Sequence, residues 1–270
     1  MPLSLLLVGS GKMGQAMLGG WIENGFESAG IVVIDPNTEN LAYATELGCR
    51  GIDSAEDIPD DFQPDIIVLA VKPQIIKDVL GTFRRLTERG SLVISIAAGT
   101  RISTFEEAFG KSVAVIRVMP NTPAAVHQGM MVCCPNPHVG ASQRNHCDQL
   151  MQAIGEVAWI EDEGLMDAVT GVSGSGPAYV FYMIEAMTAA GIDAGLPEEL
   201  AVKLAEQTVA GAGALARQSA ETAAQLRKNV TSPNGTTAAG LAVLMDEKKG
   251  LGPLMKETVA AATNRSRELG

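Results

Sequence analysis

The chain has 270 residues, of which 46% are hydrophobic and 19% are charged, and its formal net charge is −11. This length and composition are typical of a globular protein with a core in one large domain or two smaller ones, and they exclude a disordered chain. The acidic balance argues against a nucleic-acid partner, because binding a phosphate backbone requires a basic face.

The sequence carries no export, membrane or metal-binding signal. No basic segment or cleavage site precedes the first apolar run, and the most apolar later run, Ala178 to Ile192, contains Glu185 and is too short to cross a bilayer. The four cysteines form no CxxC pair, and the three histidines show no HExxH spacing. We therefore expect a cytoplasmic chain with buried, reduced thiols, no metal and no membrane partner.

A glycine loop follows the first expected strand, residues 5–8, and precedes an expected helix at residues 13–24. In the pattern GxGxxG, Gly9 allows a tight turn, Gly11 lets the backbone approach a pyrophosphate, and Gly14 lets the helix pack close to the strand. The helix N-terminus adds N–H groups and partial positive charge. This context favours a dinucleotide site over a plain tight turn. The predicted cofactor contacts here are Gly9, Gly11, Lys12, Met13 and Gly14.

Asp35 ends the second expected strand, residues 31–35. An acidic residue at this distance from the glycine loop accepts a hydrogen bond from a ribose 2′-OH in dinucleotide-binding folds. Alternatively, Asp35 caps the turn that it forms with Pro36 and Asn37. No arginine follows closely to hold a 2′-phosphate, so the pattern favours NADH weakly.

Strands and helices alternate as far as residue 160. We expect further strands at residues 50–52, 65–71, 92–96, 113–118, 128–134 and 157–160, and helices at residues 41–47, 74–85, 102–109 and 143–154. This alternation predicts an α/β, Rossmann-type, doubly wound parallel sheet in a domain of residues 1–161.

Residues just beyond the later strands are further cofactor candidates, because ligands of open parallel sheets bind at the carboxyl ends of the strands. Val71, Lys72 and Pro73 follow one strand, although Lys72 could equally be a solvated charge. Ala97 and Gly99 follow the next strand, and such small residues let the backbone lie against a flat ring.

The alternation stops near residue 162, and residues 162–270 are expected to form an all-α domain. Helices are expected at residues 164–170, 176–191, 197–219, 224–229, 235–247 and 254–267. The helices between Pro177 and Leu215 are rich in alanine, glycine and apolar residues, which predicts a buried subunit interface and an obligate dimer or a multiple of it.

Two helix starts in this half are candidate anion sites. Ser175 lies in a Gly- and Ser-rich segment before Pro177, where a structural N-cap alone is the alternative explanation. Gly235, Thr236 and Thr237 follow a strong turn, and their consecutive N–H groups and two hydroxyls suit a carboxylate. An ordinary N-cap is again the alternative.

Five segments in order, GxGxxG, A-V-K-P, M-P-N-T-P, S-G-S-G-P-A-Y and T-S-P-N-G-T-T, make the chain similar to the Δ1-pyrroline-5-carboxylate reductases over its whole length. The sequence departs from the family pattern at Asn234, where glycine is usual. Asparagine tolerates positive φ, so we expect the turn to survive.

The resemblance implies reduction of Δ1-pyrroline-5-carboxylate to proline with reduced NADP or NAD. It implies a Rossmann domain followed by a helical domain that interlocks in a homodimer, with further assembly of dimers in some members. It places Met119 and Asn121 beside the nicotinamide. The substrate would be bound by Ser175, Gly235, Thr236 and Thr237. Thr237, the candidate catalytic residue, would hydrogen-bond the ring nitrogen, or solvent would supply its proton.

Two other functions agree less well with these residues. A β-hydroxyacid dehydrogenase of similar layout needs a basic lysine early in the long helix of the second domain, and residues 171–195 contain neither lysine nor histidine. A non-catalytic dinucleotide sensor that only dimerises through its helical half would not need Thr236 and Thr237 as an anion site. A protonated cyclic imine needs no nucleophile, metal or buried base, which agrees with the residues present.

Overall fold

The computed structural model describes residues 3–270 and divides into two compact units. The first unit runs to Gly174 and includes Thr263–Gly270, and the second is Ser175–Ala262. This division lies later in the chain than the boundary expected after residue 161. The last residues also return to the first unit, which no local sequence signal indicates.

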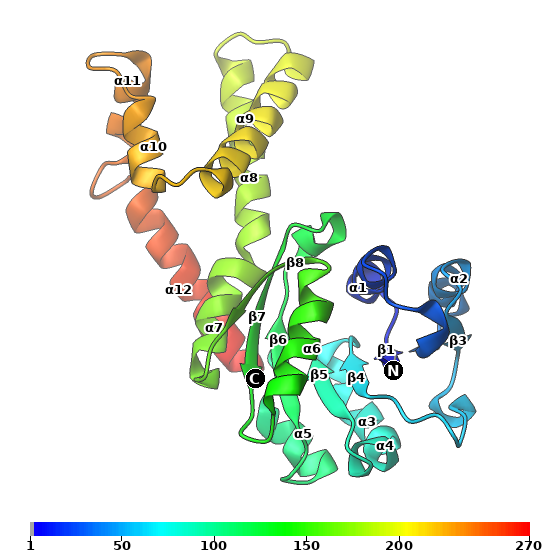
Figure 1. Cartoon of the computed structure of the whole chain (residues 1–270). Helices are drawn as coiled ribbons and strands as arrows, with labels where there is room; N and C mark the ends of the chain where they lie inside the picture. The colour runs from blue at the N-terminus through cyan, green and yellow to red at the C-terminus, as the bar shows by residue number, and fades with distance from the viewer. Residues whose placement is uncertain (1–2) are drawn as a thin grey trace. The chain divides into compact units, whose positions relative to one another are not determined.

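An eight-stranded sheet with the order β3-β2-β1-β4-β5-β6-β7-β8 forms the centre of the first unit (Figure 1). The strands are β1 (Leu5–Val8), β2 (Ile31–Ile34), β3 (Arg50–Ile52), β4 (Ile66–Leu69), β5 (Leu92–Ser95), β6 (Val115–Met119), β7 (Gly129–Pro135) and β8 (Gly155–Trp159). Strands β1 to β6 are parallel, which confirms the doubly wound, Rossmann-type class.

The last two strands correct the expectation of a wholly parallel sheet. Strand β7 pairs antiparallel with β6, and β8 pairs parallel with β7. The chain between β6 and β7 holds only a short 3-10 helix, Thr122–Val126. A parallel return requires a longer crossover, usually a helix, so this short connection reverses the direction of the strand.

Helices cover both faces of the sheet (Figure 1). They are α1 (Lys12–Glu23), α2 (Thr38–Glu46), α3 (Ile76–Leu80), α4 (Arg84–Glu88), α5 (Ile102–Phe109), α6 (Ala141–Gln152) and α7 (Met166–Val169). Neighbouring strand residues point to opposite faces, so Leu5 and Leu7 belong to one core and Leu6 and Val8 to the other. Both faces of the sheet are therefore shielded from water, which explains the uninterrupted apolar runs of these strands.

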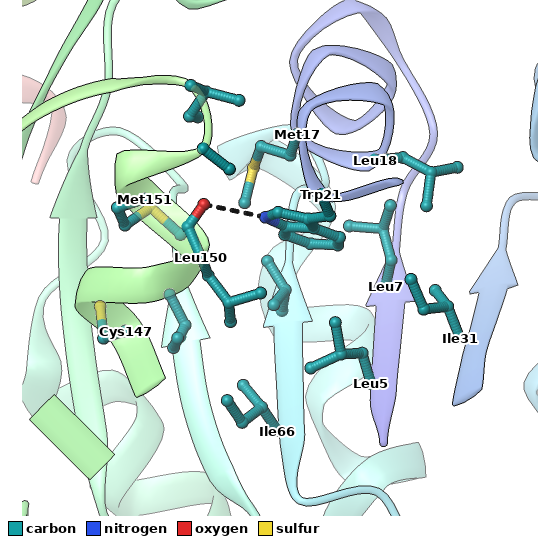
Figure 2. Packing of buried hydrophobic residues seen from close by; sticks show 14 of the residues in the cluster. Leu5, Leu7, Met17, Leu18, Trp21, Ile31, Ile66, Cys147, Leu150 and Met151 are labelled. Carbon is teal, nitrogen blue, oxygen red and sulfur yellow. Dashed lines mark hydrogen bonds between the residues drawn. The ribbon is translucent and has the colours of Figure 1, made fainter. Parts of the chain in front are cut away.

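Trp21 illustrates how the core on the α1 and α6 side is closed (Figure 2). Its side chain is fully buried, and its Nε1–H donates to the Leu150 carbonyl at 3.0 Å. The indole therefore contributes its whole apolar area without leaving a polar group unpaired.

The helix expected at residues 74–85 is broken into short pieces. Residues Pro73–Ile75 and Gly81–Phe83 are 3-10 turns, and α3 lies between them. Gly81 falls in the middle of this stretch, and glycine costs about 1 kcal/mol in a helix interior. Burial of Ile76 and Phe83, rather than helix propensity, holds the segment on the sheet.

The second unit is helical. Its helices are α8 (Gly176–Asp193), α9 (Glu198–Gln218), α10 (Ala223–Asn229), α11 (Thr236–Leu244) and most of α12 (Leu251–Leu269). Helices α8 and α9 pack against each other, and a Cβ at Gly191 would lie 3.3 Å from the Cβ of Ala201. Among the described residues of this unit, only Ala201 and Ala205 are buried hydrophobics. Tyr182 is 71% exposed and Phe181 is 57% exposed.

All four cysteines are free and buried in the first unit. Burial, reinforced by the nearby Glu163 carboxylate, raises the pKa of the Cys134 thiol to about 11. The Cys134 thiol therefore remains protonated and unreactive near neutral pH. Within residues 3–270 no helix combines the length and hydropathy needed to cross a membrane.

Candidate functional site

A cavity of about 730 Å³ opens at the carboxyl ends of β1, β2 and β4. Strand order reverses here, because β1 lies between β2 and β4, and ligands of open α/β sheets bind at such switch points. Five predicted cofactor residues line it: Gly9, Gly11, Asp35, Val71 and Lys72. The strand ends therefore bring together residues that are far apart in the sequence.

Each of the three positions in the loop is glycine for a different physical reason. Gly9 has φ +97°, and a Cβ there would lie 2.8 Å from the carbonyl carbon of Ala70. A Cβ on Gly14 would collide with the carbonyl oxygen of Gly9, so α1 packs too closely for a side chain. At Gly11, by contrast, no described atom lies within 4 Å of an added Cβ. Protein packing therefore does not require Gly11, and its open side faces the cavity.

Lys12 and Met13 are the first residues of α1. Lys12 is exposed, and the Met13 side chain packs against the core. Neither residue lines the cavity, but both carry backbone N–H groups at the helix start, which lack acceptors inside the helix.

Asp35 is 7% exposed, and its carboxylate already accepts three hydrogen bonds. One oxygen accepts from Ser10 N–H at 2.7 Å and from Asn40 Nδ2 at 3.1 Å. The other accepts from Asn37 N–H at 2.9 Å, so the turn-capping role is present in the structure. The carboxylate joins the glycine loop to the turn after β2, while its ribose contact stays a prediction.

The cavity also includes polar residues that sequence reasoning missed. Asn40 lies on α2, and Ser54 and Glu56 follow β3. Strand β3 has only three residues, and so short a strand is a weak sequence signal that the turn beyond it reaches the same cavity. Its parallel pairing with β2 is what places that turn beside Asp35.

Three sheet-edge candidates, Pro73, Ala97 and Gly99, do not line this cavity. Pro73 begins a 3-10 turn directly after Lys72, which is exposed and does line the cavity. Ala97 is buried. Gly99 has φ +75°, and a Cβ there would meet the carbonyl oxygen of Leu269 at 3.3 Å. Packing against the end of α12 is therefore one reason for the glycine at this position.

The loop after β6 lies against the segment that leads to α8. Met119 ends β6, and its methyl group would collide with a Cβ at Gly174. The Asn121 side chain donates to the carbonyl and hydroxyl oxygens of Ser173, both at 3.3 Å, and accepts from Met130 N–H at 2.8 Å. Asn121 is thus engaged with protein groups on both sides of its amide.

Ser175 is the residue before α8, but its side chain makes no capping hydrogen bond within the described chain. Its backbone is helical, with φ −86° and ψ −19°, whereas an N-cap residue is normally extended. The structure therefore contradicts the simple N-cap explanation for Ser175. The hydroxyl remains available for a ligand.

The turn before α11 forms as expected, with one correction. Asn234 has φ 59°, so asparagine replaces the glycine that this turn usually has. Gly235 N–H donates to the Ser232 carbonyl at 3.1 Å, so it is used by the turn and is not free as expected. The free N–H groups therefore begin at Thr236, the first residue of α11.

Thr236 and Thr237 are both exposed at the start of α11. The N-cap residue of this helix is Gly235, and no side-chain cap is formed within the described chain. The ordinary capping role considered for the threonines is therefore absent. Two hydroxyls and adjacent N–H groups at a helix N-terminus form a suitable binding site for a carboxylate.

Comparison with known proteins agrees with this arrangement. A family model described as pyrroline-5-carboxylate reductase dimerisation matches residues 163–269. A second, described as NADP oxidoreductase, coenzyme F420-dependent, matches residues 4–99, which include the glycine loop. The helical half and the first part of the sheet thus match separately.

Matches over the whole chain are also found. A pyrroline-5-carboxylate reductase of Pseudomonas aeruginosa is 40% identical over 267 residues, which cover 98% of this chain and 96% of the relative. The structure of such an enzyme from Coxiella burnetii has a TM-score of 0.94 at 33% identity, covering 100% of this chain and 99% of that one. A Plasmodium falciparum pyrroline carboxylate reductase with NADP bound has a TM-score of 0.84 at 31% identity, covering 99% and 98%. With this identity and fold over its full length, the chain belongs to the pyrroline-5-carboxylate reductase family.

Proposed function

We propose that this chain reduces Δ1-pyrroline-5-carboxylate to L-proline with NADPH or NADH, the last step of proline biosynthesis. The observation that carries the proposal is the full-length match to a pyrroline-5-carboxylate reductase at 40% identity. In this reaction, the C=N bond of the protonated cyclic imine accepts a hydride at carbon. The ring nitrogen becomes the amine of proline, and the nicotinamide is oxidised.

The first unit, which contains the sheet and is called the sheet unit from here on, has a cavity that suits a dinucleotide. The cavity lies at the switch point, Gly11 leaves its open side free, and the first N–H groups of α1 can receive a pyrophosphate. When bound, the reduced nicotinamide supplies the hydride. The chain's own contribution is to hold the loop rigidly, through the Ser10–Asp35 hydrogen bond and the close packing at Gly9 and Gly14.

The second unit, Ser175–Ala262, is called the helical unit from here on and supplies the carboxylate site in this proposal. The N–H groups and hydroxyls of Thr236 and Thr237 bind the substrate carboxylate, and the positive end of the α11 dipole favours its charge. The Asn234 turn and Gly235 shape the approach, because a Cβ on Gly235 would collide with the Ser232 hydroxyl. Orientation of an imine that is already electrophilic is sufficient for a large part of the rate. Thr237 is the residue that we propose to contact the ring nitrogen.

The assay follows NAD(P)H absorbance when the purified chain receives Δ1-pyrroline-5-carboxylate, with and without EDTA. We expect turnover that the chelator does not change, since no cluster of three potential metal ligands is found among residues 3–270. A parallel assay supplies β-hydroxyacids with NAD(P)⁺ and should give no turnover. Activity only toward hydroxyacids, or loss of activity with EDTA, would contradict the proposal.

We further propose that the enzyme acts in the cytoplasm and that its dimers can associate into larger assemblies. Four free, buried thiols are typical of chains kept in a reducing compartment. The many exposed apolar side chains of α8 and α9 offer more surface than a small contact would cover. Light scattering on the purified protein measures the assembly directly.

A further inference from the structure

The side chain of Asn121 has an orientation that its partners determine. Met130 N–H can only donate, and it lies 2.8 Å from one end of the carboxamide, which must therefore be the oxygen. The Ser173 carbonyl can only accept, so the nitrogen faces it at 3.3 Å. The amide thus bridges the loop after β6 to residue 173, 52 positions further along the chain.

The carbonyl that Asn121 reaches lacks its regular helical partner. In a helix the Ser173 carbonyl would accept from the N–H of the residue four positions later, which is Pro177. Proline has no N–H, so this acceptor is left open by the sequence itself. The local helix is also irregular, because Thr170–Gly174 forms a π-helical turn. Asn121 supplies the hydrogen bond that Pro177 cannot.

Met119 makes a second contact with the same segment. Its methyl group occupies the space where a Cβ on Gly174 would lie, so the glycine allows the loop and the turn to pack closely. The loop itself is rigid: Ala124 is fully buried, and a Cβ on Gly129 would lie 2.9 Å from the Cα of Ala124. Two contacts from a rigid loop therefore hold the π-helical turn immediately before Ser175.

We propose that Asn121 is a positioning residue, which fixes the turn before Ser175 by replacing the missing N–H of Pro177. This role rests on the proposed function and specifies it further, because Ser175 is a predicted substrate contact whose hydroxyl makes no cap. It differs from the expectation that Asn121 binds the nicotinamide directly. The two roles predict different losses when the carboxamide is altered.

The test uses Asn121→Asp in the full-length protein. Aspartate has the same shape and still accepts from Met130 N–H, but it cannot donate to the Ser173 carbonyl. We expect kcat/KM for Δ1-pyrroline-5-carboxylate to fall about tenfold to a hundredfold. The Kd for NADPH, measured by fluorescence, should change less than about threefold, corresponding to under 1 kcal/mol. A direct nicotinamide contact would instead weaken NADPH binding in parallel.

Two further variants sharpen the result. Ser173→Ala keeps the carbonyl and should retain kcat/KM within about threefold of the original protein. Pro177→Ala restores an N–H at the position that can serve the Ser173 carbonyl, so combining it with Asn121→Asp should recover part of the lost activity. If Asn121→Asp fails to fold, Gly174→Ala tests the second contact, since its Cβ displaces the Met119 methyl and should produce the same kinetic loss.

The outcomes separate this inference from the proposed function. No turnover by the unaltered protein would overturn the proposed function and this role with it. Normal turnover by both the unaltered protein and Asn121→Asp would overturn the positioning role alone. A parallel loss of NADPH affinity without rescue by Pro177→Ala would assign Asn121 to the cofactor instead.

Discussion

The two units of this chain bury apolar residues very differently. The sheet unit has dry cores on both faces of its sheet, and side chains such as Leu5, Trp21 and Phe105 are fully buried. In the helical unit, Val243 is 73% exposed and Leu215 is 55% exposed. The sheet unit buries its large apolar side chains within its own chain. The helical unit instead exposes an amount of apolar surface that is rare in monomers.

This difference agrees with the match of residues 163–269 to a dimerisation family. Ala- and Gly-rich helices such as α8 and α9 approach each other closely but enclose little volume, so large side chains point outward. A second copy can bury them, and the family match shows that a dimerisation domain is present. Stability of the helical unit should therefore depend on protein concentration, while stability of the sheet unit should not.

The largest expected effect comes from placing a charge on the exposed apolar face. If α8 lies in the proposed dimer interface, Phe181→Glu should leave the protein monomeric at micromolar concentration and abolish most of the activity, because losing an aromatic interface residue costs about 2–4 kcal/mol. Light scattering and the kinetic assay check this. Gln218→Glu, an exposed charge at the end of α9, is the matched control and should remain dimeric.

Thr237→Ala tests the anion site of the helical unit. A hydrogen bond to a charged group contributes about 1.5–3 kcal/mol, so kcat/KM for the imino acid should fall roughly tenfold to a hundredfold. If Thr237 also contacts the ring nitrogen in the transition state, part of the loss should appear in kcat. NADPH affinity should hardly change, because the glycine loop belongs to the other unit.

The control for Thr237 is Thr258→Ala, since Thr258 is a half-buried helical threonine whose hydroxyl donates to the Leu254 carbonyl. It should leave kinetics unchanged. The structure predicts little loss of stability for Thr237→Ala, because this threonine caps nothing. A lower melting temperature with unchanged kcat/KM would show that the residue is structural only.

Within the sheet unit, Gly9→Ala should mainly lower stability, whereas Gly11→Ala should mainly weaken cofactor binding. Gly9→Ala forces a side chain onto φ +97° and against Ala70, which should cost more than about 2 kcal/mol of unfolding free energy. Gly11→Ala should leave stability within about 0.5 kcal/mol while raising the KM for NADPH about tenfold. Denaturant unfolding and cofactor kinetics on both variants test this contrast. Equal effects on stability would show that Gly11 also serves packing.

The smallest expected effect concerns cofactor choice. Asp35→Ser removes a carboxylate that would repel a 2′-phosphate, so the NADPH-to-NADH ratio of kcat/KM should rise about fivefold, corresponding to about 1 kcal/mol. Asp53→Ser removes another carboxylate of the same cavity and is the control, with a smaller change in the ratio. Strong NADPH preference in the unaltered protein would instead mean that Asp35 serves the Ser10 and Asn37 hydrogen bonds and does not face the ribose.

Much of the fold, and the choice of several candidate site residues, could be predicted from short stretches of sequence. The apolar run at residues 5–8, the three glycines after it and the turn at Asn234 each act through local physics: burial of a strand, freedom of φ and helix-start chemistry. Neighbouring residues indicate the strand, the turns and the positions of the glycines, so the sequence alone was sufficient to predict them. The close contact of Gly9 with Ala70 comes from the fold. The resemblance of the later motifs then indicated the substrate class.

Other features depend on partners that are distant in the chain, and only the tertiary structure decided them. The direction of β7 depends on which strand the short loop returns to, and Gly99 packs against residues at the end of α12. Asp35 accepts from Ser10, and Asn121 donates to Ser173. Local pattern predicts that such polar groups need partners, but the identity of a partner is set by packing in three dimensions, which no spacing of residues encodes.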